Sequence, residues 1–252
     1  NHTLRVTPTL PHSLTHSPQL LPHLPPTLQL PHSLTHSLMS AVSSQFFWDS
    51  FFHPNQNTTC NRSEWYFSTT DILPTLLPTL LPHSHTHLLN DPTTLILHAG
   101  IGNAPIQESI LKYFKGICMQ FDFSIHALNQ VEATPSLTHS LDLFVANALV
   151  MPLRSGLFDL IIEKGLFDSV TGRADIAVER ASELVSEYHR CLRVGGQVVM
   201  FSLYSPSSED KDMLGLLRHS CMSVECRDLF ISPVEIPSQD FCFAYIITKT
   251  EE

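Results

Sequence analysis

From Thr94 onward, short apolar runs alternate with segments whose apolar residues recur at helical spacing. This alternation is typical of a parallel sheet with helices on both faces. Strands are predicted at residues 94–98, 117–122, 143–147, 158–163, 197–203, 224–230 and 241–248. Helices are predicted at residues 105–115, 174–192 and 210–219, and a short one after the strand at 117–122 that runs to about residue 132. The pattern therefore indicates an α/β fold with a doubly wound sheet, closed by a pair of strands near the carboxyl terminus.

Two details of this pattern predict local structure. The segments 143–147 and 158–163 are so apolar that both strands are expected to be covered on both faces. The helix over 174–192 is followed by Gly195 and Gly196, which we expect to end it.

Residues 1–40 are built from Leu, Thr, His, Ser and Pro, with the unit Thr-His-Ser repeated at Thr15 and Thr35. Such a segment has neither helical nor strand periodicity and is predicted to be disordered. Most of the chain's 15 histidines lie in this and related repeats, without an HExxH pattern or closely paired cysteines. We therefore expect no metal site.

Composition narrows the function classes. A net charge of −10 disfavours nonspecific binding to nucleic acid or anionic membrane, since both require a basic surface. The same charge is compatible with a basic partner. The alternative is that an acidic balance only keeps the protein soluble. The 6 cysteines contain no CxxC pair and are interpreted as free intracellular thiols. No apolar run is long enough to span a membrane, so a cytoplasmic protein is expected.

The most informative segment is residues 95–105, with the sequence LILHAGIGNAP. A strand that runs into Gly100-x-Gly102 and then a helix places a turn without side chains at the carboxyl edge of the sheet. There a ligand can approach the backbone and the positive end of the helix. Two glycines also occur in ordinary strand-to-helix turns, so this feature alone is weak.

Asp122 strengthens the prediction. It ends the next strand, 22 positions after Gly100, where a carboxylate can accept hydrogen bonds from the hydroxyls of an adenosine ribose. The dinucleotide pattern requires a third glycine, but Pro105 stands in its place. S-adenosylmethionine (SAM), which has no pyrophosphate, is therefore favoured over NAD or FAD.

Further along, residues 158–168 read FDLIIEKGLFD and resemble the (D/E)KGTLD signature of a group of eukaryotic lysine methyltransferases. This group includes the elongation factor and citrate synthase lysine methyltransferases. Other segments resemble its motifs in the same order: FWDSFF at 47–52, EWY at 64–66, GIGN at 100–103, DFS at 122–124, LRVGG at 192–196 and FCFAY at 241–245.

The resemblance implies a class I, Rossmann-like methyltransferase fold whose seven-stranded sheet has an antiparallel last strand. It also implies three parts: the disordered segment 1–40, an aromatic cap at 41–93 and the SAM-binding domain at 94–252. The residues implied to bind SAM are Trp48, Phe52, Trp65, Gly100, Gly102, Asp122, Phe123, Asn147, Ala148 and Lys164. The expected substrate is a protein lysine, in an elongation factor or another basic acceptor, and a mitochondrial location is the alternative to the cytoplasm.

For methyl transfer to lysine, Trp65, Tyr66 and Phe167 are expected to line a dry channel for the amine. Glu163, which we expect to face the methyl donor together with Lys164, or Asp168 would orient the amine. The catalytic candidates are therefore Glu163, Asp168 and Tyr66.

The chain also departs from the family pattern. His98 stands where many class I methyltransferases have an acid, Asn147 replaces a carboxylate, and Leu166 replaces the signature threonine. These departures motivate a second hypothesis, a noncatalytic protein of the same fold that binds a partner. A small-molecule methyltransferase is the third.

Overall fold

The protein is described here from a computed structural model, over residues 44–53, 76–81, 88, 90–103, 114–132, 142–173, 175–207, 212–218, 221–229 and 242–251. Several predictions lie outside these residues. They are the disordered segment 1–40, the helix over 105–115 up to residue 113, and the roles of Trp65 and Tyr66; residues 114 and 115 are described and are not helical.

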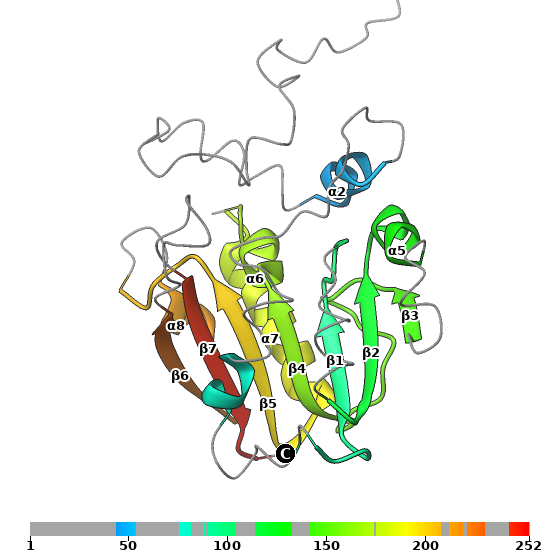
Figure 1. Ribbon diagram of the computed structural model, residues 1–252. Helices are drawn as coiled ribbons and strands as arrows, with labels where there is room; N and C mark the ends of the chain where they lie inside the picture. Colours follow the sequence, from blue (N-terminus) through cyan, green and yellow to red (C-terminus); the bar gives the residue numbers. More distant parts are fainter. Residues whose placement is uncertain are drawn as a thin grey trace, which may run out of the picture.

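The core of the molecule is one sheet (Figure 1). Its strands follow the order β3-β2-β1-β4-β5-β7-β6. Strand β7 is antiparallel to both of its neighbours, and the other paired strands are parallel. The predicted seven-stranded, mostly parallel fold with an antiparallel last strand is therefore confirmed. The strands are β1 (Leu95–Ala99), β2 (Ile117–Asp122), β3 (Asp142–Val145), β4 (Phe158–Lys164), β5 (Leu192–Ser202), β6 (Met222–Leu229) and β7 (Cys242–Lys249).

Helices cover both faces of the sheet. The described helices are α2 (Gln45–Phe51), α5 (Ile125–Glu132), α6 (Leu166–Val170), α7 (Ala177–Cys191), α8 (Met213–Leu216) and a short helix over 76–80. Helix α2 lies beyond the carboxyl ends of β1 and β2, close to α5 (Figure 1). None of the helices described here has the length and apolar character needed to cross a lipid bilayer.

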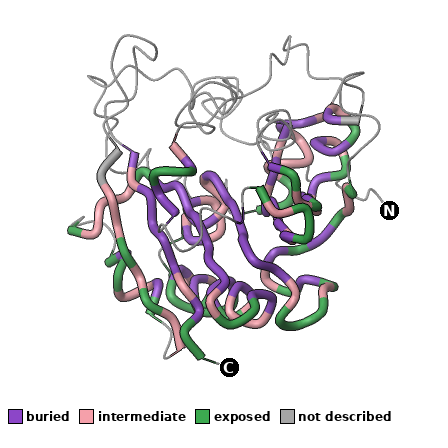
Figure 2. Tube along the Cα trace, turned by 60° about the horizontal axis from the view of Figure 1, so that its bottom comes forward, coloured by how far each residue is buried: buried purple, intermediate pink, exposed green. Residues whose placement is uncertain are grey.

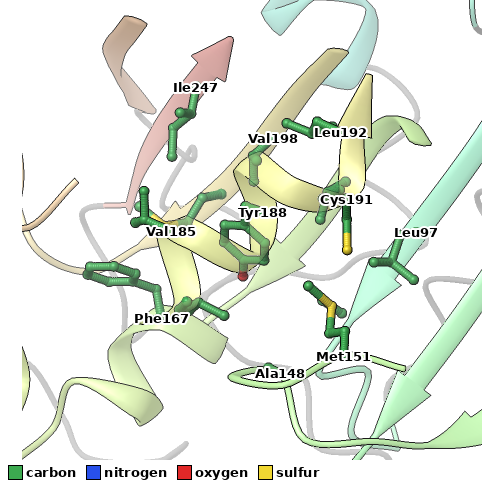
Figure 3. Packing of buried hydrophobic residues seen from close by; sticks show 14 of the residues in the cluster. Leu97, Ala148, Met151, Phe167, Val185, Tyr188, Cys191, Leu192, Val198 and Ile247 are labelled. Atoms are coloured by element: carbon green, nitrogen blue, oxygen red, sulfur yellow. The ribbon is translucent and has the colours of Figure 1, made fainter. Parts of the chain in front are cut away.

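The apolar core is divided between the two faces, because successive strand residues point to opposite sides. On one face α7 packs Leu184, Val185 and Tyr188 against the strands (Figure 3). On the other face Leu77 and Leu80, from the helix over 76–80, pack against the sheet. The central strands are almost entirely buried between these layers (Figure 2).

The prediction that Gly195 and Gly196 end a helix is wrong. Helix α7 ends at Cys191, and β5 begins at the next residue, where the backbone turns to φ −72° and ψ 142°. The glycines lie inside β5. Gly195 has φ 78°, and a Cβ atom on Gly196 would lie 2.9 Å from the carbonyl oxygen of Phe158. Their bare backbone therefore permits an irregular start of the strand beside β4, where the register shifts.

The expected full burial of the strand near 143–147 is also wrong. In the described sheet β3 is the edge strand and pairs only with β2. Its residues are exposed or half-buried, and Val145 is 50% exposed. By contrast, every residue of β4, a central strand, is buried as predicted.

Candidate cofactor site

The turn after β1, residues 100–103, is called the glycine turn below. Gly100 and Gly102 have φ values of 64° and 55°, in the left-handed region that glycine adopts without strain. The backbone N–H of Ile101 donates to the carbonyl oxygen of Phe121 over 3.1 Å, which fixes the turn to β2. A Cβ atom on Gly100 would lie 2.9 Å from Cδ1 of Leu166. Conformation and close packing therefore both require glycine at position 100.

The carboxylate of Asp122 contacts this turn directly. Asp122 is the last residue of β2 and is 5% exposed. Its Oδ2 accepts a hydrogen bond from the N–H of Gly102 over 2.8 Å, and its Oδ1 accepts one from the N–H of Ser124 over 2.9 Å. The two features that the sequence places 22 positions apart thus meet at the carboxyl edge of the sheet.

Burial changes the acidity of Asp122. It raises the pKa of this carboxyl group to about 6, against the lowering effect of the N–H groups of Ser124, Gly102 and Phe123, and the charge of Asp49 raises it further. At neutral pH the group therefore carries a charge that the protein alone solvates poorly. A ligand with further hydrogen-bond donors would stabilise that charge.

The geometry fits a ribose. An ionised carboxylate offers about four acceptor positions, two on each oxygen. The N–H groups of Gly102 and Ser124 occupy one position on each oxygen. The N–H of Phe123 also bonds to this carboxylate, so the acceptor capacity that remains can serve a hydroxyl of an adenosine ribose.

Helix α2 covers the glycine turn with aromatic residues. Ser44 caps this helix, because its Oγ accepts a hydrogen bond from the N–H of Phe47. Phe52, which follows the helix and is 2% exposed, places its Cζ 3.3 Å from where a Cβ atom on Gly102 would lie. The ring of Trp48 stacks on Phe52 with centroids 5.7 Å apart. Phe52 thus contacts the glycine turn and Trp48 packs on Phe52, whereas Trp65 is outside the described residues.

A hydrogen-bonded chain that the sequence did not reveal holds the turn to both helices. Asn103 donates from Nδ2 to Oε1 of Gln130 over 2.9 Å. Gln130, on α5, donates from Nε2 to the carbonyl oxygen of Phe52 over 2.7 Å. Asn103 stands in the GIGN motif, so its position was visible, but Gln130 carried no signal in the sequence.

The residues expected to lie beside adenine include two that follow β3. The N–H of Ala146 donates to the carbonyl oxygen of Asp122 over 3.0 Å, which places Asn147 next to the end of β2. Asn147 is exposed, and its Oδ1 accepts a bond from the N–H of Leu149 over 3.0 Å, so a second lone pair remains for a ligand. Ala148 packs into the core beneath α7 (Figure 3). Phe123 is half-buried, and its carbonyl oxygen accepts from Nε2 of Gln45 over 3.4 Å.

Contrary to the prediction from the sequence, the side chains at the end of β4 do not both face the methyl donor. Glu163 and Lys164 are consecutive strand residues, so their side chains point to opposite faces of the sheet and do not both face one methyl donor. Glu163 is fully buried, and its Oε2 accepts bonds from the N–H groups of Leu166 over 2.7 Å and Phe167 over 3.3 Å. It therefore caps the start of α6.

Burial raises the pKa of Glu163 well above its ordinary value, and the charge of Asp168 adds to this effect. Asp168 is itself engaged in the structure: its Oδ1 accepts from Oγ of Ser202 over 2.7 Å, and its Oδ2 accepts from the N–H of Leu203 over 3.1 Å. Both carboxylates thus hold the backbone at the carboxyl ends of β4 and β5. Their proposed contact with an amine stays a prediction.

Phe167 and His98 are both buried in the core, which corrects the role expected for Phe167 and explains the presence of His98. Phe167 is fully buried in the core beneath α7, so it does not line an open channel. Burial lowers the pKa of His98 to about 3, and Nδ1 lies 3.3 Å from Oε1 of Gln120. His98 is therefore a neutral core residue and does not replace the missing acid.

This strand order, with a glycine turn after β1 and a carboxylate at the end of β2, defines the class I methyltransferase fold. In agreement, residues 97–200 match a family described as a methyltransferase domain. The domain implies SAM as its cofactor. A sequence search of curated proteins finds no match.

Solved structures share the fold at low sequence identity. A SAM-dependent methyltransferase from Methanosarcina mazei is 15% identical, with a TM-score of 0.53, over 68% of this chain and 99% of that one. A putative SAM-dependent methyltransferase from Methanococcus maripaludis is 14% identical, with a TM-score of 0.54, over 73% of this chain and 86% of that one. Phosphoethanolamine N-methyltransferase 2 from Haemonchus contortus, solved with S-adenosylhomocysteine and phosphomonomethylethanolamine, is 12% identical, with a TM-score of 0.51, over 71% of this chain and 52% of that one.

Proposed function

We propose that the protein is a SAM-dependent methyltransferase that acts on a lysine side chain of a protein. The cofactor assignment rests on the hydrogen bond between Asp122 and Gly102. This bond places a carboxylate that can accept further hydrogen bonds beside a backbone that a ligand can approach. When bound, SAM supplies a methyl group activated by a sulfonium.

The residues of this chain would align the reactants and exclude water. Methyl transfer is an in-line displacement, so its rate depends on orientation and on dry surroundings. Asp122 would accept the ribose hydroxyls, and Gly100 and Gly102 would allow close approach of the methionine end. Trp48 and Phe52 would shield the bound cofactor from solvent.

A lysine acceptor is supported by the resemblance of residues 158–168 to a lysine methyltransferase signature and by the net charge of −10, which suits a basic partner such as an elongation factor. The amine must lose a proton whose ordinary pKa is near 10.4, and a desolvated site favours this loss. Glu163 or Asp168, the buried acids nearest the end of β4, would orient the amine. We propose a cytoplasmic location for this reaction, with the mitochondrion as the alternative.

The test uses SAM with an isotope-labelled methyl group, added with purified protein to a lysate. We expect label in a protein band, at a lysine identified by mass spectrometry, and loss of labelling in Asp122→Ala. Asp175→Ala is the matched control, because it also removes a carboxylate, one that is 63% exposed and pairs with Arg173. No labelled protein with the wild type, or equal labelling by Asp122→Ala, would contradict the proposal.

Two observations favour a noncatalytic alternative. His98 is a neutral core residue where many relatives have an acid, and the side chain of Leu166 packs against Gly100. Tight SAM binding by calorimetry, without turnover on any lysate fraction, would support this alternative. Label in the low-mass fraction would instead indicate a small-molecule acceptor, such as the small amine in the Haemonchus contortus structure.

A further inference from the structure

Strands β3 and β4 are joined by residues 146–157, called the crossover below, which contain neither a helix nor a strand. The crossover nevertheless buries Ala146, Ala148 and Met151 in the core beneath α7. A buried segment without regular structure must find partners for its backbone N–H and C=O groups elsewhere. For this crossover, α7 supplies many of them.

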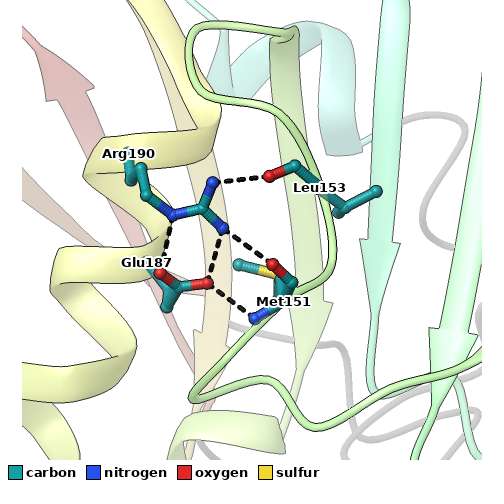
Figure 4. Close-up of polar contacts among 4 residues, drawn as sticks. All are labelled: Met151, Leu153, Glu187 and Arg190. Carbon is teal, nitrogen blue, oxygen red and sulfur yellow. Dashed lines mark hydrogen bonds and ion pairs between the residues drawn. The ribbon is translucent and has the colours of Figure 1, made fainter.

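Arg190 and Glu187, both on α7, form a clamp on the middle of the crossover (Figure 4). The guanidinium of Arg190 donates to the carbonyl oxygen of Leu153 over 2.6 Å and to that of Met151 over 2.9 Å. Oε2 of Glu187 accepts from the N–H of Met151 over 2.7 Å. Arg190 also pairs with both oxygens of Glu187 at 2.7 Å, which holds the two side chains in one plane.

Protonation behaviour agrees with a permanently charged clamp. Burial raises the pKa of Glu187, but bonds from Arg190 and Met151 lower it more, so the pKa lies below its ordinary value. The clamp is thus charged at any pH near neutrality.

The first residues of the crossover are attached to the cofactor site by backbone hydrogen bonds. The N–H of Val150 donates to the carbonyl oxygen of Asn147 over 3.1 Å, and the N–H of Ala146 donates to that of Asp122 over 3.0 Å. Asn147 therefore lies between two fixed points: Asp122, at the end of β2, and the clamp at Met151. Releasing the clamp frees the segment whose first residues are next to the predicted adenine position.

We propose that Arg190, held by Glu187, is a positioning residue that sets the adenine-recognising end of the crossover at Asn147. This inference rests on the proposed function, because it assumes an adenosine cofactor. Lysine does not replace arginine here, since one ammonium lacks the planar fork that contacts Glu187 and both carbonyl groups together.

The test compares two ligands by calorimetry: S-adenosylhomocysteine, and S-inosylhomocysteine, in which an oxygen replaces the adenine amino group. The wild type should prefer the adenosyl ligand. In Arg190→Gln we expect adenosyl affinity to fall about tenfold while inosyl affinity changes little, so the preference shrinks. Arg190→Lys should be intermediate. Arg180→Gln is the control, because Arg180 lies on the same helix in an exposed pair with Glu183.

The outcomes separate the two proposals. A wild type that binds neither ligand refutes the proposed function. A wild type that binds both equally, an unchanged preference in Arg190→Gln, or an equal loss for both ligands overturns the positioning role. If Arg190→Gln does not fold, Arg190→Lys, which keeps the charge but lacks the planar fork, decides the question by the same preference.

Discussion

Replacing Asp122 by asparagine should stabilise the ligand-free protein at neutral pH and weaken SAM binding. The carboxyl group is 5% exposed, and burial raises its pKa from 3.8 to about 6. Its charged form is therefore less stable in the folded protein than in the unfolded chain. A neutral side chain of the same shape avoids this cost but lacks the charge that a ribose would stabilise.

The magnitude follows from the pKa values. Between about pH 4 and pH 6 the folded protein binds more protons at Asp122 than the unfolded chain does, so stability falls as pH rises through this range. At pH 7 the accumulated cost is about 3 kcal/mol, at 1.36 kcal/mol for each pKa unit. Asparagine has one acceptor oxygen, so the N–H of Gly102 or Ser124 loses its partner at a cost of about 1 kcal/mol. The variant should therefore be more stable by about 2 kcal/mol.

Binding should change in the opposite direction. Loss of one charge-assisted acceptor would weaken SAM binding by roughly tenfold to 100-fold. In the wild type we expect SAM to bind the ionised carboxylate, so its affinity should fall about tenfold for each pH unit below about 6, the pKa of Asp122. The affinity of Asp122→Asn should not depend on pH in this way.

Urea unfolding at pH 4.5 and pH 7 measures the stability difference, and calorimetry over the same range measures SAM affinity. Subtracting the variant from the wild type removes the contribution of other buried acids, such as Glu163. A variant that is less stable than the wild type at pH 7, or that binds SAM with the wild-type pH dependence, would refute the reasoning.

Four further substitutions, one of them a control, test packing and burial. Gly100→Ala and Gly156→Ala start from the same φ of 64°, but a Cβ atom at Gly100 meets Leu166 at 2.9 Å, whereas one at Gly156 meets nothing within 4 Å. Each should lose about 1 kcal/mol from backbone strain, and only Gly100→Ala should also lose SAM binding; equal SAM affinity in both would contradict this. Glu163→Gln should be more stable than the wild type at pH 8, since burial raises the pKa of this group and glutamine keeps an acceptor for Leu166; urea unfolding that shows lower stability would contradict it. Tyr188→Phe removes a buried hydroxyl that has no hydrogen-bond partner among the described residues, so unfolding should show a change of less than about 1 kcal/mol, and a larger loss would reveal a partner for it.

The order of strands and helices followed from local pattern alone. The alternation of apolar runs with helical periodicity predicted β1, β2 and α7 closely. It did so because the spacing of apolar residues along the chain distinguishes a strand from a helix. The spacing of Gly100, Gly102 and Asp122 predicted that these residues lie at one edge of the sheet. The structure brings them together there because parallel strands place their carboxyl ends at a common edge.

Other features depend on which segments become neighbours in space. Whether β3 lies at an edge, and whether Asp168 contacts the N–H of Leu203, depends on the packing of distant elements. The clamp of Arg190 on the crossover joins residues 37 to 39 positions apart. Local periodicity contains no information on such contacts, since the hydrogen bonds that decide them form only when the sheet and α7 come together.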